Sequence, residues 1–417
     1  MDNVSTYTLR DYQIEGVAAA LYNFSHYRDP FLLVAATGAG KSLMIADICY
    51  RLDEPVLVIC PSKELLEQDH DKMLSYGITD IAKYSASVGI KEVAKYTFAT
   101  IGSIYKKPEL FTRFRHFIID ECHLVDPKSM NGRYAQFFAA IDKPRVMGLT
   151  ATPYRLTQKT FKKNNKLYYT SCLKMVNRIW PYFFKKIIYK VEMADLIKRG
   201  YLCPIEYVRE PVDMSGLSVN RSGSDYTPES LAQYWNEQRL NRLERALIYV
   251  DQNHKHSLTF CVDTEQAKRI QQRLSTHGLM LDIVTGETPT KERADTVAAF
   301  RRGETRHILN VGVFTTGFDV PELDCIVMAR PTISLTLWQQ IVGRGVRVDS
   351  NNPNKKLTVY DLTGVSDRLG RVETVRIAKE TDGFRDKVVS ELGDMTDTPL
   401  FTFVVKRRAK SLVAESK

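Results

Sequence analysis

The chain has 417 residues, of which 44% are hydrophobic and 26% charged, a composition that excludes a long disordered or fibrous protein. Its length predicts two or three domains, and its formal charge of +10 favours a polyanionic partner. The N-terminus lacks a signal-like pattern, no run is long enough to span a membrane, and the seven cysteines fall mostly in apolar runs. We therefore expect a cytoplasmic protein with reduced thiols and no membrane partner.

Short apolar runs alternate with helical segments along most of the chain. The runs are continuous rather than alternating, which is typical of parallel strands covered on both faces. The helices between them have recognisable start and stop signals. Asp263 or Thr264 can cap a helix that ends at Gly278, and a helix over 292–302 is followed by Gly303. The pattern predicts an α/β fold with two doubly wound parallel-sheet domains. The predicted strands are 31–35, 56–60, 97–101, 117–120 and 146–150, then 258–262, 281–284, 307–314, 325–329 and 357–362.

A turn of small residues follows the first apolar run, and a helix begins directly after it. Such a turn lets backbone N–H groups converge on a phosphate, and the helix start adds its dipole. Lys41 would then reach the outer phosphates, and Ser42 would offer a hydroxyl to Mg²⁺. The alternative is a chance Gly-rich turn, since Ala35 stands where the usual pattern has its first glycine. The candidate nucleotide-binding residues are Thr37, Gly38, Ala39, Gly40, Lys41 and Ser42.

Two adjacent carboxylates follow the predicted strand 117–120, at the strand end where α/β proteins bind ligands. Asp120 could hold Mg²⁺ through water, and Glu121 could accept a proton from an attacking water. After the next strand, the hydroxyls of Thr150 and Thr152 could bond to the segment that ends at His123. The alternatives are a helix start for the carboxylates and a simple strand-end turn for the threonines.

Residues 155–200 combine many lysines and arginines with interleaved aromatic residues. This mixture suits single-strand nucleic-acid binding, where bases stack and phosphates pair with cations. An equally open alternative is a solvated helical excursion whose aromatic residues pack on the first domain. Residues 215–224 are typical of a loop or linker, and the basic run 406–410 is more typical of a solvated tail than of a phosphate grip.

Residues 339–347 contain a second pair of candidate phosphate ligands, Arg344 and Arg347. They are three positions apart, so on one helical turn they would point the same way, in step with Gln340. Two guanidinium groups on one face suit the γ-phosphate of a nucleotide held by another domain, and the alternative is an ordinary exposed face.

With these motifs in this order, the chain resembles the superfamily two helicases of the DExH type. The resemblance implies two tandem RecA-like domains with an ATP cleft between them. It assigns Arg10, Gln13, Gly317 and Asp319 to the nucleotide, Gln13 by bonding adenine. It makes Lys41, Asp120, Glu121, Gln340, Arg344 and Arg347 catalytic. The residues that it implies for nucleic-acid contact or coupling are Pro61, Ser62, Lys63, Thr100, Ser103, His123, Thr150, Thr152, Thr285, Gly286, Thr315 and Thr316.

Within that superfamily the chain is most similar to bacterial RadD-type repair ATPases, in residues 150–156, 200–202 and 339–345. That family usually continues into a cysteine-rich zinc region, whereas no cysteine follows Cys325, so we expect ATP and Mg²⁺ but no zinc. The expected domains are residues 1–205 for ATP binding, with the basic aromatic segment inside them, 206–245 as linker and bridging helix, 246–365 as the second domain, and 366–417 as an extension.

The resemblance implies an ATP-dependent helicase or translocase acting on single-stranded or branched DNA in repair or recombination, with DNA favoured over RNA. Only about seventeen residues separate Pro321 from Gln339, which leaves no room for a long strand-splitting pin, so translocation is expected over processive unwinding. A monomer is favoured, and a repair partner protein is possible. The motor subunit of a restriction-type complex, an RNA helicase and a nonhydrolysing clamp stay open, although the intact catalytic set argues against the clamp. A metabolic P-loop kinase is excluded because it would not need the second domain.

Overall fold

The computed structural model describes residues 8–125, 132–164, 166–220, 222–315, 318–381, 383–404 and 412–414. Contacts within the chain divide it into two units. One comprises Met1–Arg155 and Met175–Glu192, and the other comprises Leu156–Lys174 and Met193–Lys417. The backbone therefore passes from one unit to the other three times, after residues 155, 174 and 192.

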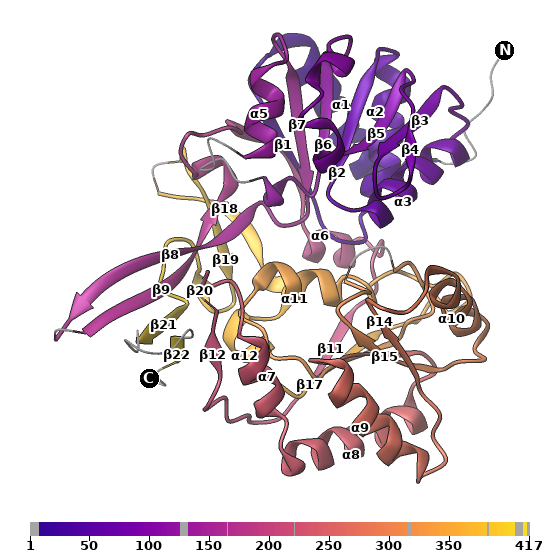
Figure 1. Cartoon of the computed structure of the whole chain (residues 1–417), viewed down its shortest axis with the longest axis vertical. Coiled ribbons are helices and arrows are strands. Elements are labelled where there is room, and N and C mark those ends of the chain that lie inside the picture. The colour runs from indigo at the N-terminus through magenta and orange to yellow at the C-terminus, as the bar shows by residue number, and fades with distance from the viewer. Residues whose placement is uncertain are drawn as a thin grey trace. The chain divides into compact units, whose positions relative to one another are not determined.

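The first unit is built on an eight-stranded sheet with the order β10-β1-β7-β6-β2-β5-β3-β4 (Figure 1). Neighbouring strands run parallel except β3 and β4. Every residue of β1, β2 and β6 is buried, as their continuous apolar sequences predict. The strands are β1 (Phe31–Ala35), β2 (Val56–Cys60), β3 (Ile81–Ser85), β4 (Ile90–Lys91), β5 (Tyr96–Thr100), β6 (His116–Asp120), β7 (Arg145–Thr150) and β10 (Lys186–Val191), and the helices are α1 (Asp11–His26), α2 (Lys41–Leu52), α3 (Lys63–Ser75), α4 (Ile101–Ile104) and α5 (Arg133–Ala139).

The second unit is built on a six-stranded sheet with the order β11-β17-β16-β13-β15-β14, in which all neighbours are parallel. The prediction of two doubly wound parallel-sheet domains is therefore confirmed. The strands are β11 (Ile205–Arg209), β13 (Ser257–Phe260), β14 (Asp282–Thr285), β15 (His307–Val311), β16 (Cys325–Met328) and β17 (Leu357–Asp361), and the helices are α6 (Met193–Lys198), α7 (Pro228–Tyr234), α8 (Glu237–Asn253), α9 (Thr264–Ser275), α10 (Thr290–Arg302), α11 (Leu335–Val342) and α12 (Val365–Leu369).

Two smaller sheets also belong to the second unit. A five-stranded sheet has the order β12-β22-β21-β9-β8, and a three-stranded sheet has the order β18-β19-β20. Their strands are β8 (Tyr154–Lys163), β9 (Lys166–Met175), β12 (Ser218–Val219), β21 (Phe401–Val404), β22 (Leu412–Ala414), β18 (Arg376–Lys379), β19 (Asp386–Ser390) and β20 (Gly393–Asp394). The loop expected at residues 215–224 thus contains one short strand, β12.

Residues 155–200 are not the helical excursion considered from their composition, and that alternative is wrong. They form β8, β9 and β10, and α6 is the one α-helix among their described residues. The segment also divides between the units, because residues 156–174 group with the second unit and 175–192 return to the first. Phe184 is buried in the core of the first unit, with Phe183 packed against it, so some of the aromatic residues do pack there as considered.

The basic run 406–410 lies outside the described residues, as do Thr316 and Gly317. No helix in the described ranges combines the length and the apolar character needed to cross a bilayer.

Candidate active site

The turn between β1 and α2 adopts the conformation that its glycines predict. Gly38 and Gly40 have φ angles of 86° and 77°, in the left-handed region that favours glycine. A Cβ on Gly40 would also lie 2.6 Å from Gln13 Nε2, so a larger residue there would clash with α1. α2 begins at Lys41, as predicted. The backbone thus presents a helix start to any phosphate bound at this turn.

Gln13 ties the start of α1 to this turn. Its Nε2 donates to Ala39 O at 2.9 Å, and its Oε1 accepts from Arg10 N at 2.9 Å. The hydroxyl of Tyr12 donates to the same Ala39 oxygen at 3.1 Å. The amide of Gln13 keeps a second hydrogen and a second lone pair, which are the groups that bidentate binding of adenine requires. The role of Gln13 and Arg10 in adenine recognition stays a prediction.

Lys41 and the two carboxylates after β6 lie together. Lys41 Nζ is 3.3 Å from Glu121 Oε1, and both side chains are largely buried. Asp120 is buried as well, and its Oδ1 has no hydrogen-bond partner within the described residues. A buried carboxylate oxygen without a partner beside the Ser42 turn fits the oxygen ligands that Mg²⁺ prefers. The donor set therefore fits the metal predicted for Ser42 and Asp120.

The surroundings shift the pKa values of the two carboxyl groups in opposite directions. Burial, followed by the charges of Asp69 and Glu121, raises the pKa of Asp120 well above its usual value. Burial would also raise the pKa of Glu121, but the charge of Lys41 and the hydrogen bond with His123 outweigh it and hold this pKa far below its usual range. The surroundings therefore favour the charged form of Glu121 more than that of Asp120.

A hydrogen-bond network joins these carboxylates to the end of β7. Thr150 Oγ1 donates to Glu121 Oε2 at 3.2 Å and accepts from Thr152 N at 3.0 Å. His123 Nδ1 lies 2.9 Å from Thr150 Oγ1 and 3.3 Å from Thr152 Oγ1. All four side chains are buried. The bonds between the threonine hydroxyls and the Asp-Glu-Cys-His segment, predicted from sequence, are therefore present.

Sequence reasoning missed one carboxylate at this site, Asp69 of α3. It is 2% exposed, its side chain hydrogen-bonds to Ser42, and Cys60 Sγ lies 3.7 Å from its Oδ2. Burial raises the pKa of Asp69 to about 6, opposed by the bond to Ser42 and the charge of Lys41. The signal in the sequence is its place on the apolar stripe of α3, between the buried Leu66 and Met73.

Replacing Asp69 by alanine is expected to lower the affinity of the nucleotide site for Mg²⁺, so that more Mg²⁺ is needed for half-maximal ATP binding. The Ser42 hydroxyl would lose the acceptor that directs its lone pairs toward the metal. Loss of such a supporting group typically costs about 10-fold or more in metal affinity. A Mg²⁺ titration of fluorescent-ATP binding measures the effect. Asp71→Ala, which changes an exposed carboxylate of the same helix, is the control and should leave the titration midpoint unchanged.

The other residues predicted to contact nucleic acid in the first unit follow β2 and β5. Ser62 caps α3 by accepting from Leu65 N at 3.3 Å. Thr100 Oγ1 lies 2.9 Å from Ser103 Oγ, which accepts from Ala86 N. Pro61 and Lys63 flank Ser62, so these residues share the carboxyl edge of the sheet with the turn and the carboxylates. Whether they contact nucleic acid stays a prediction.

Gln340, Arg344 and Arg347 belong to the second unit, but the two arginines do not share a helical turn as predicted. α11 ends at Val342, so Arg344 lies in a turn and Arg347 in an isolated bridge with Leu202. The prediction overlooked Gly345, which packs so closely on Leu357 that an added Cβ would lie 2.4 Å from its Cδ1.

The two arginines nevertheless meet at one segment, residues 318–319. Arg344 Nη1 donates to Phe318 O at 3.4 Å, and Arg347 forms an ion pair with Asp319. Arg347, predicted to be catalytic, is thus in contact with Asp319, predicted to bind the nucleotide. Thr285 and Gly286 follow β14, where Thr285 Oγ1 accepts from Glu287 N, and Thr315 follows β15.

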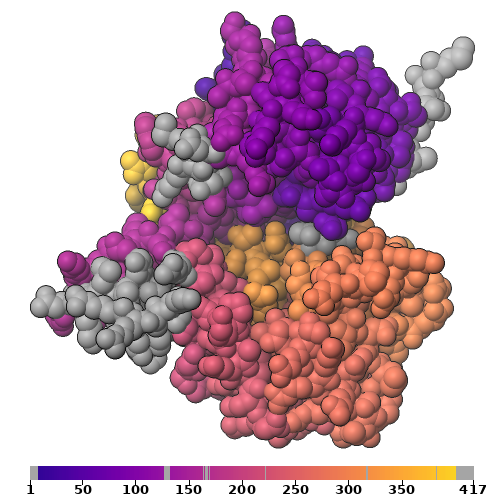
Figure 2. Space-filling model, in the orientation of Figure 1, coloured from indigo at the N-terminus to yellow at the C-terminus, as the bar shows by residue number. Residues whose placement is uncertain are grey.

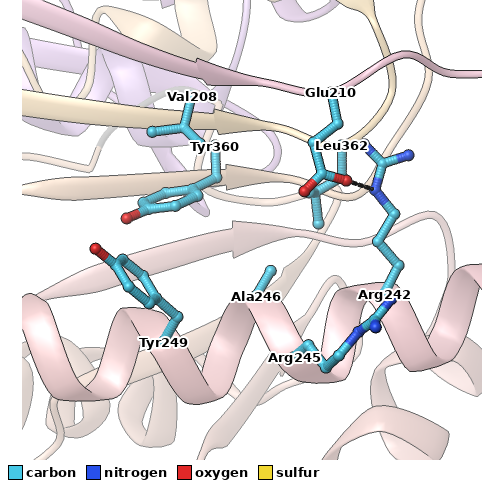
Figure 3. Close-up of a pocket in the computed structure, with 8 residues that line it drawn as sticks. All are labelled: Val208, Glu210, Arg242, Arg245, Ala246, Tyr249, Tyr360 and Leu362. Atoms are coloured by element: carbon cyan, nitrogen blue, oxygen red, sulfur yellow. Dashed lines mark ion pairs between the residues drawn. The ribbon is translucent and has the colours of Figure 1, made fainter.

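The second unit also has a cavity of about 490 Å³ between α8 and the edge of its sheet (Figure 3). Tyr249 and Tyr360 point toward one another across it, and Arg242 Nε pairs with Glu210 Oε2 at 2.5 Å. None of the predicted site residues lines this cavity.

Two family descriptions match the chain. Residues 6–155 match "Type III restriction enzyme, res subunit", and residues 238–349 match "Helicase conserved C-terminal domain". IRC3 of Saccharomyces cerevisiae, which carries the name of an ATP-dependent helicase, is 24% identical over 390 residues, covering 86% of this chain and 52% of its own. The chain thus spans about half the length of that relative.

A DNA 3'-5' translocase, XPB2 of Sulfurisphaera tokodaii, is 26% identical over 363 residues, covering 81% of this chain and 78% of its own. Among solved structures, a fragment assigned as the HsdR subunit of a type I restriction enzyme from Vibrio vulnificus YJ016 aligns with a TM-score of 0.60. Its identity is 19%, and the alignment covers 88% of this chain and 66% of that one, so it shows the fold with two RecA-like domains. The two family matches lie in the first and the second unit, and together with these relatives they show that the chain belongs to the superfamily two helicases.

Proposed function

We propose that the protein is an ATP-dependent nucleic-acid translocase of the DExH type. The observation that carries this proposal is the continuous chain of contacts from Lys41 through Glu121 to His123 and Thr150. Through these contacts, a change at the phosphates would alter the surroundings of His123 and Thr150, which lie beyond the proposed phosphate site. A P-loop protein that only bound nucleotide would not need these contacts.

The residues of the first unit have distinct roles in the proposed reaction. Lys41 binds the outer phosphates, while Ser42 and Asp120 hold Mg²⁺, which when bound neutralises phosphate charge. A polyphosphate competes with Glu121 for Lys41, so the pKa of Glu121 rises from its depressed value. Glu121 thereby becomes a stronger base for the attacking water.

We further propose that Gln340, Arg344 and Arg347 act on the same nucleotide from the second unit. Arginine supplied to a phosphoryl group in this way is worth roughly 10³–10⁵ in rate. The ion pair between Arg347 and Asp319 supports this role, because it holds a guanidinium beside a residue predicted to serve the nucleotide. The two RecA-like domains would correspond to the two parallel-sheet units, with the last crossing between them after residue 192.

DNA is the proposed track, with single-stranded or branched forms favoured and a role in repair or recombination. The support is the name of the XPB2 relative and the resemblance to RadD-type ATPases. Seven buried free thiols agree with a reducing compartment such as the cytoplasm.

A second candidate is the motor subunit of a restriction-type complex. The likeness to the HsdR fragment and the match to the res-subunit family favour it. Such a subunit would need partner proteins for full activity.

ATP hydrolysis by the full chain tests these proposals. Turnover is measured at one salt concentration without nucleic acid and with single-stranded DNA, forked DNA or single-stranded RNA. Strong stimulation by DNA supports a DNA translocase. Stimulation by RNA alone would make the protein an RNA helicase, and no stimulation by any of them would favour the complex-dependent motor.

Thr152→Ala is expected to uncouple movement from hydrolysis. The variant loses the hydroxyl beside His123 but keeps the bond between Thr150 and Glu121, so much of the ATPase activity should remain. Displacement of streptavidin from biotinylated DNA, measured beside ATP turnover, gives the ratio of movement to hydrolysis. Thr150→Ala is the comparison, because it removes the bond to Glu121 and should lower hydrolysis itself. An equal loss of both activities in Thr152→Ala would contradict the coupling role.

A further inference from the structure

The hairpin of β8 and β9 in the second unit has an unusual balance of charge. Residues 154–175 contain six lysines and arginines and no aspartate or glutamate. Figure 1 shows the two strands as a long ribbon, and its magenta atoms lie at the surface in Figure 2. β8 is also an edge strand of its sheet, so one side of it carries unpaired backbone groups.

The two faces of the hairpin differ. Leu156 packs against the core of the second unit, and Gln158 lies against Gly223, where a Cβ would come within 2.2 Å of Gln158 Nε2. Because side chains alternate along a strand, Lys159 and Phe161 occupy the opposite face. Residues 159–162 are exposed. The inner face is therefore structural at Leu156 and Gln158, whereas both faces of β8 are exposed from Lys159 to Lys162.

An aromatic stack lies on this outer face. The rings of Phe161 and Tyr168 are 5.3 Å apart and inclined by only 10°, and Phe161 is 41% exposed. Lys159 shares this face and pairs with Asp397 at 3.2 Å. Lys162 follows Phe161 in the strand, belongs to the other face, and has no ion pair within the described residues. A flat ring flanked by cations is the arrangement on which an unpaired base stacks while its phosphates pair with lysine.

We propose that the exposed part of β8 is a binding surface for single-stranded nucleic acid, with Phe161 stacking on a base and Lys162, on the other face across the free edge of the strand, contacting a neighbouring phosphate. The inference rests on the proposed function and names a surface for it outside the helicase motifs. A single strand fits better than a duplex, because duplex bases are stacked on each other and offer no free face to Phe161. An acidic protein segment would use the lysines but not the exposed ring.

The test compares Phe161→Ala/Lys162→Ala with the parent chain in binding a fluorescent oligothymidylate. Loss of one base stack and one phosphate contact should raise Kd by roughly 10-fold or more. The slope of log K against log salt should fall by about 0.7. ATP turnover without nucleic acid should not change. Lys268→Ala/Met280→Ala is the matched control, since it removes one exposed lysine and one apolar side chain that is 83% exposed from the same unit.

Phe161→Trp adds a readout of stacking that does not depend on the loss of a residue. It keeps an aromatic ring, so it should bind like the parent, and its added fluorescence should be quenched by the oligonucleotide. A double variant with parent-like Kd, or unquenched fluorescence from a Phe161→Trp protein that binds, would overturn the hairpin proposal and leave the proposed function intact. A parent chain that binds no nucleic acid at all would overturn both.

Discussion

Lys41→Ala is expected to abolish ATP turnover, with a fall of at least about 100-fold in kcat. Lys41 is the cation at the start of α2, and its Nζ lies 3.3 Å from Glu121 Oε1. Alanine removes the charge that would stabilise the outer phosphates. It also leaves Glu121 with less positive charge nearby, so the pKa of Glu121 should rise. Steady-state hydrolysis with saturating nucleic acid is the measurement.

The control for this change is Lys91→Ala, which removes an exposed lysine from β4. Thermal unfolding of both variants separates a lost function from a lost fold, because removing one partner of a buried ion pair can cost ~3–5 kcal/mol. A folded Lys41→Ala protein that still hydrolysed ATP at the parent rate would contradict the assignment of Lys41 to the phosphates.

Glu121→Gln is expected to bind ATP and nucleic acid but to hydrolyse ATP at least about 100-fold more slowly. Glutamine keeps the shape of the side chain and an oxygen that can accept from Thr150, so the network to β7 should survive. It cannot take a proton from water. Single-turnover hydrolysis measures the chemical step, and fluorescent-ATP binding measures the retained affinity.

Glu64→Gln, an exposed change on α3, controls for the loss of one charge. Parent-like hydrolysis by Glu121→Gln would exclude Glu121 as the base. Loss of ATP binding together with hydrolysis would instead indicate that Glu121 mainly positions Lys41.

The sequence predicted the strands that are covered on both faces and missed several at sheet edges. β1, β2 and β6 are continuous apolar runs, and their ends agree with the prediction to within one residue. β10 contains two lysines and has an exposed end, and β11 is mostly exposed, so neither stands out as an apolar run. Both lie at the edge of a sheet, where the covering layer ends. Many of their residues therefore remain exposed, and their sequences need not be continuously apolar.

The parts of the candidate site that depend on a short stretch of sequence at a strand end could be predicted. The turn before Lys41 and the bonds of Thr150 and Thr152 follow from motifs at strand ends. Asp69 was missed because the apolar stripe of α3 indicates only that its side chain is buried, whereas its place beside Ser42 depends on how α3 packs in the tertiary structure. Arg344 and Arg347 were placed on one helix because spacing alone was considered, whereas the packing of Gly345 on Leu357 belongs to the tertiary structure.

β10 follows the hairpin in the chain although it belongs to the first sheet, and this limits how the first unit can be produced separately. β10 pairs with β1 along its whole length. A fragment that stopped at Arg155 would contain every other strand of the first sheet but would leave the apolar strand β1 as an open edge. Exposed edges of this kind invite pairing between copies. Separate expression of the first unit therefore calls for a short artificial loop from Arg155 to Met175, rather than for truncation.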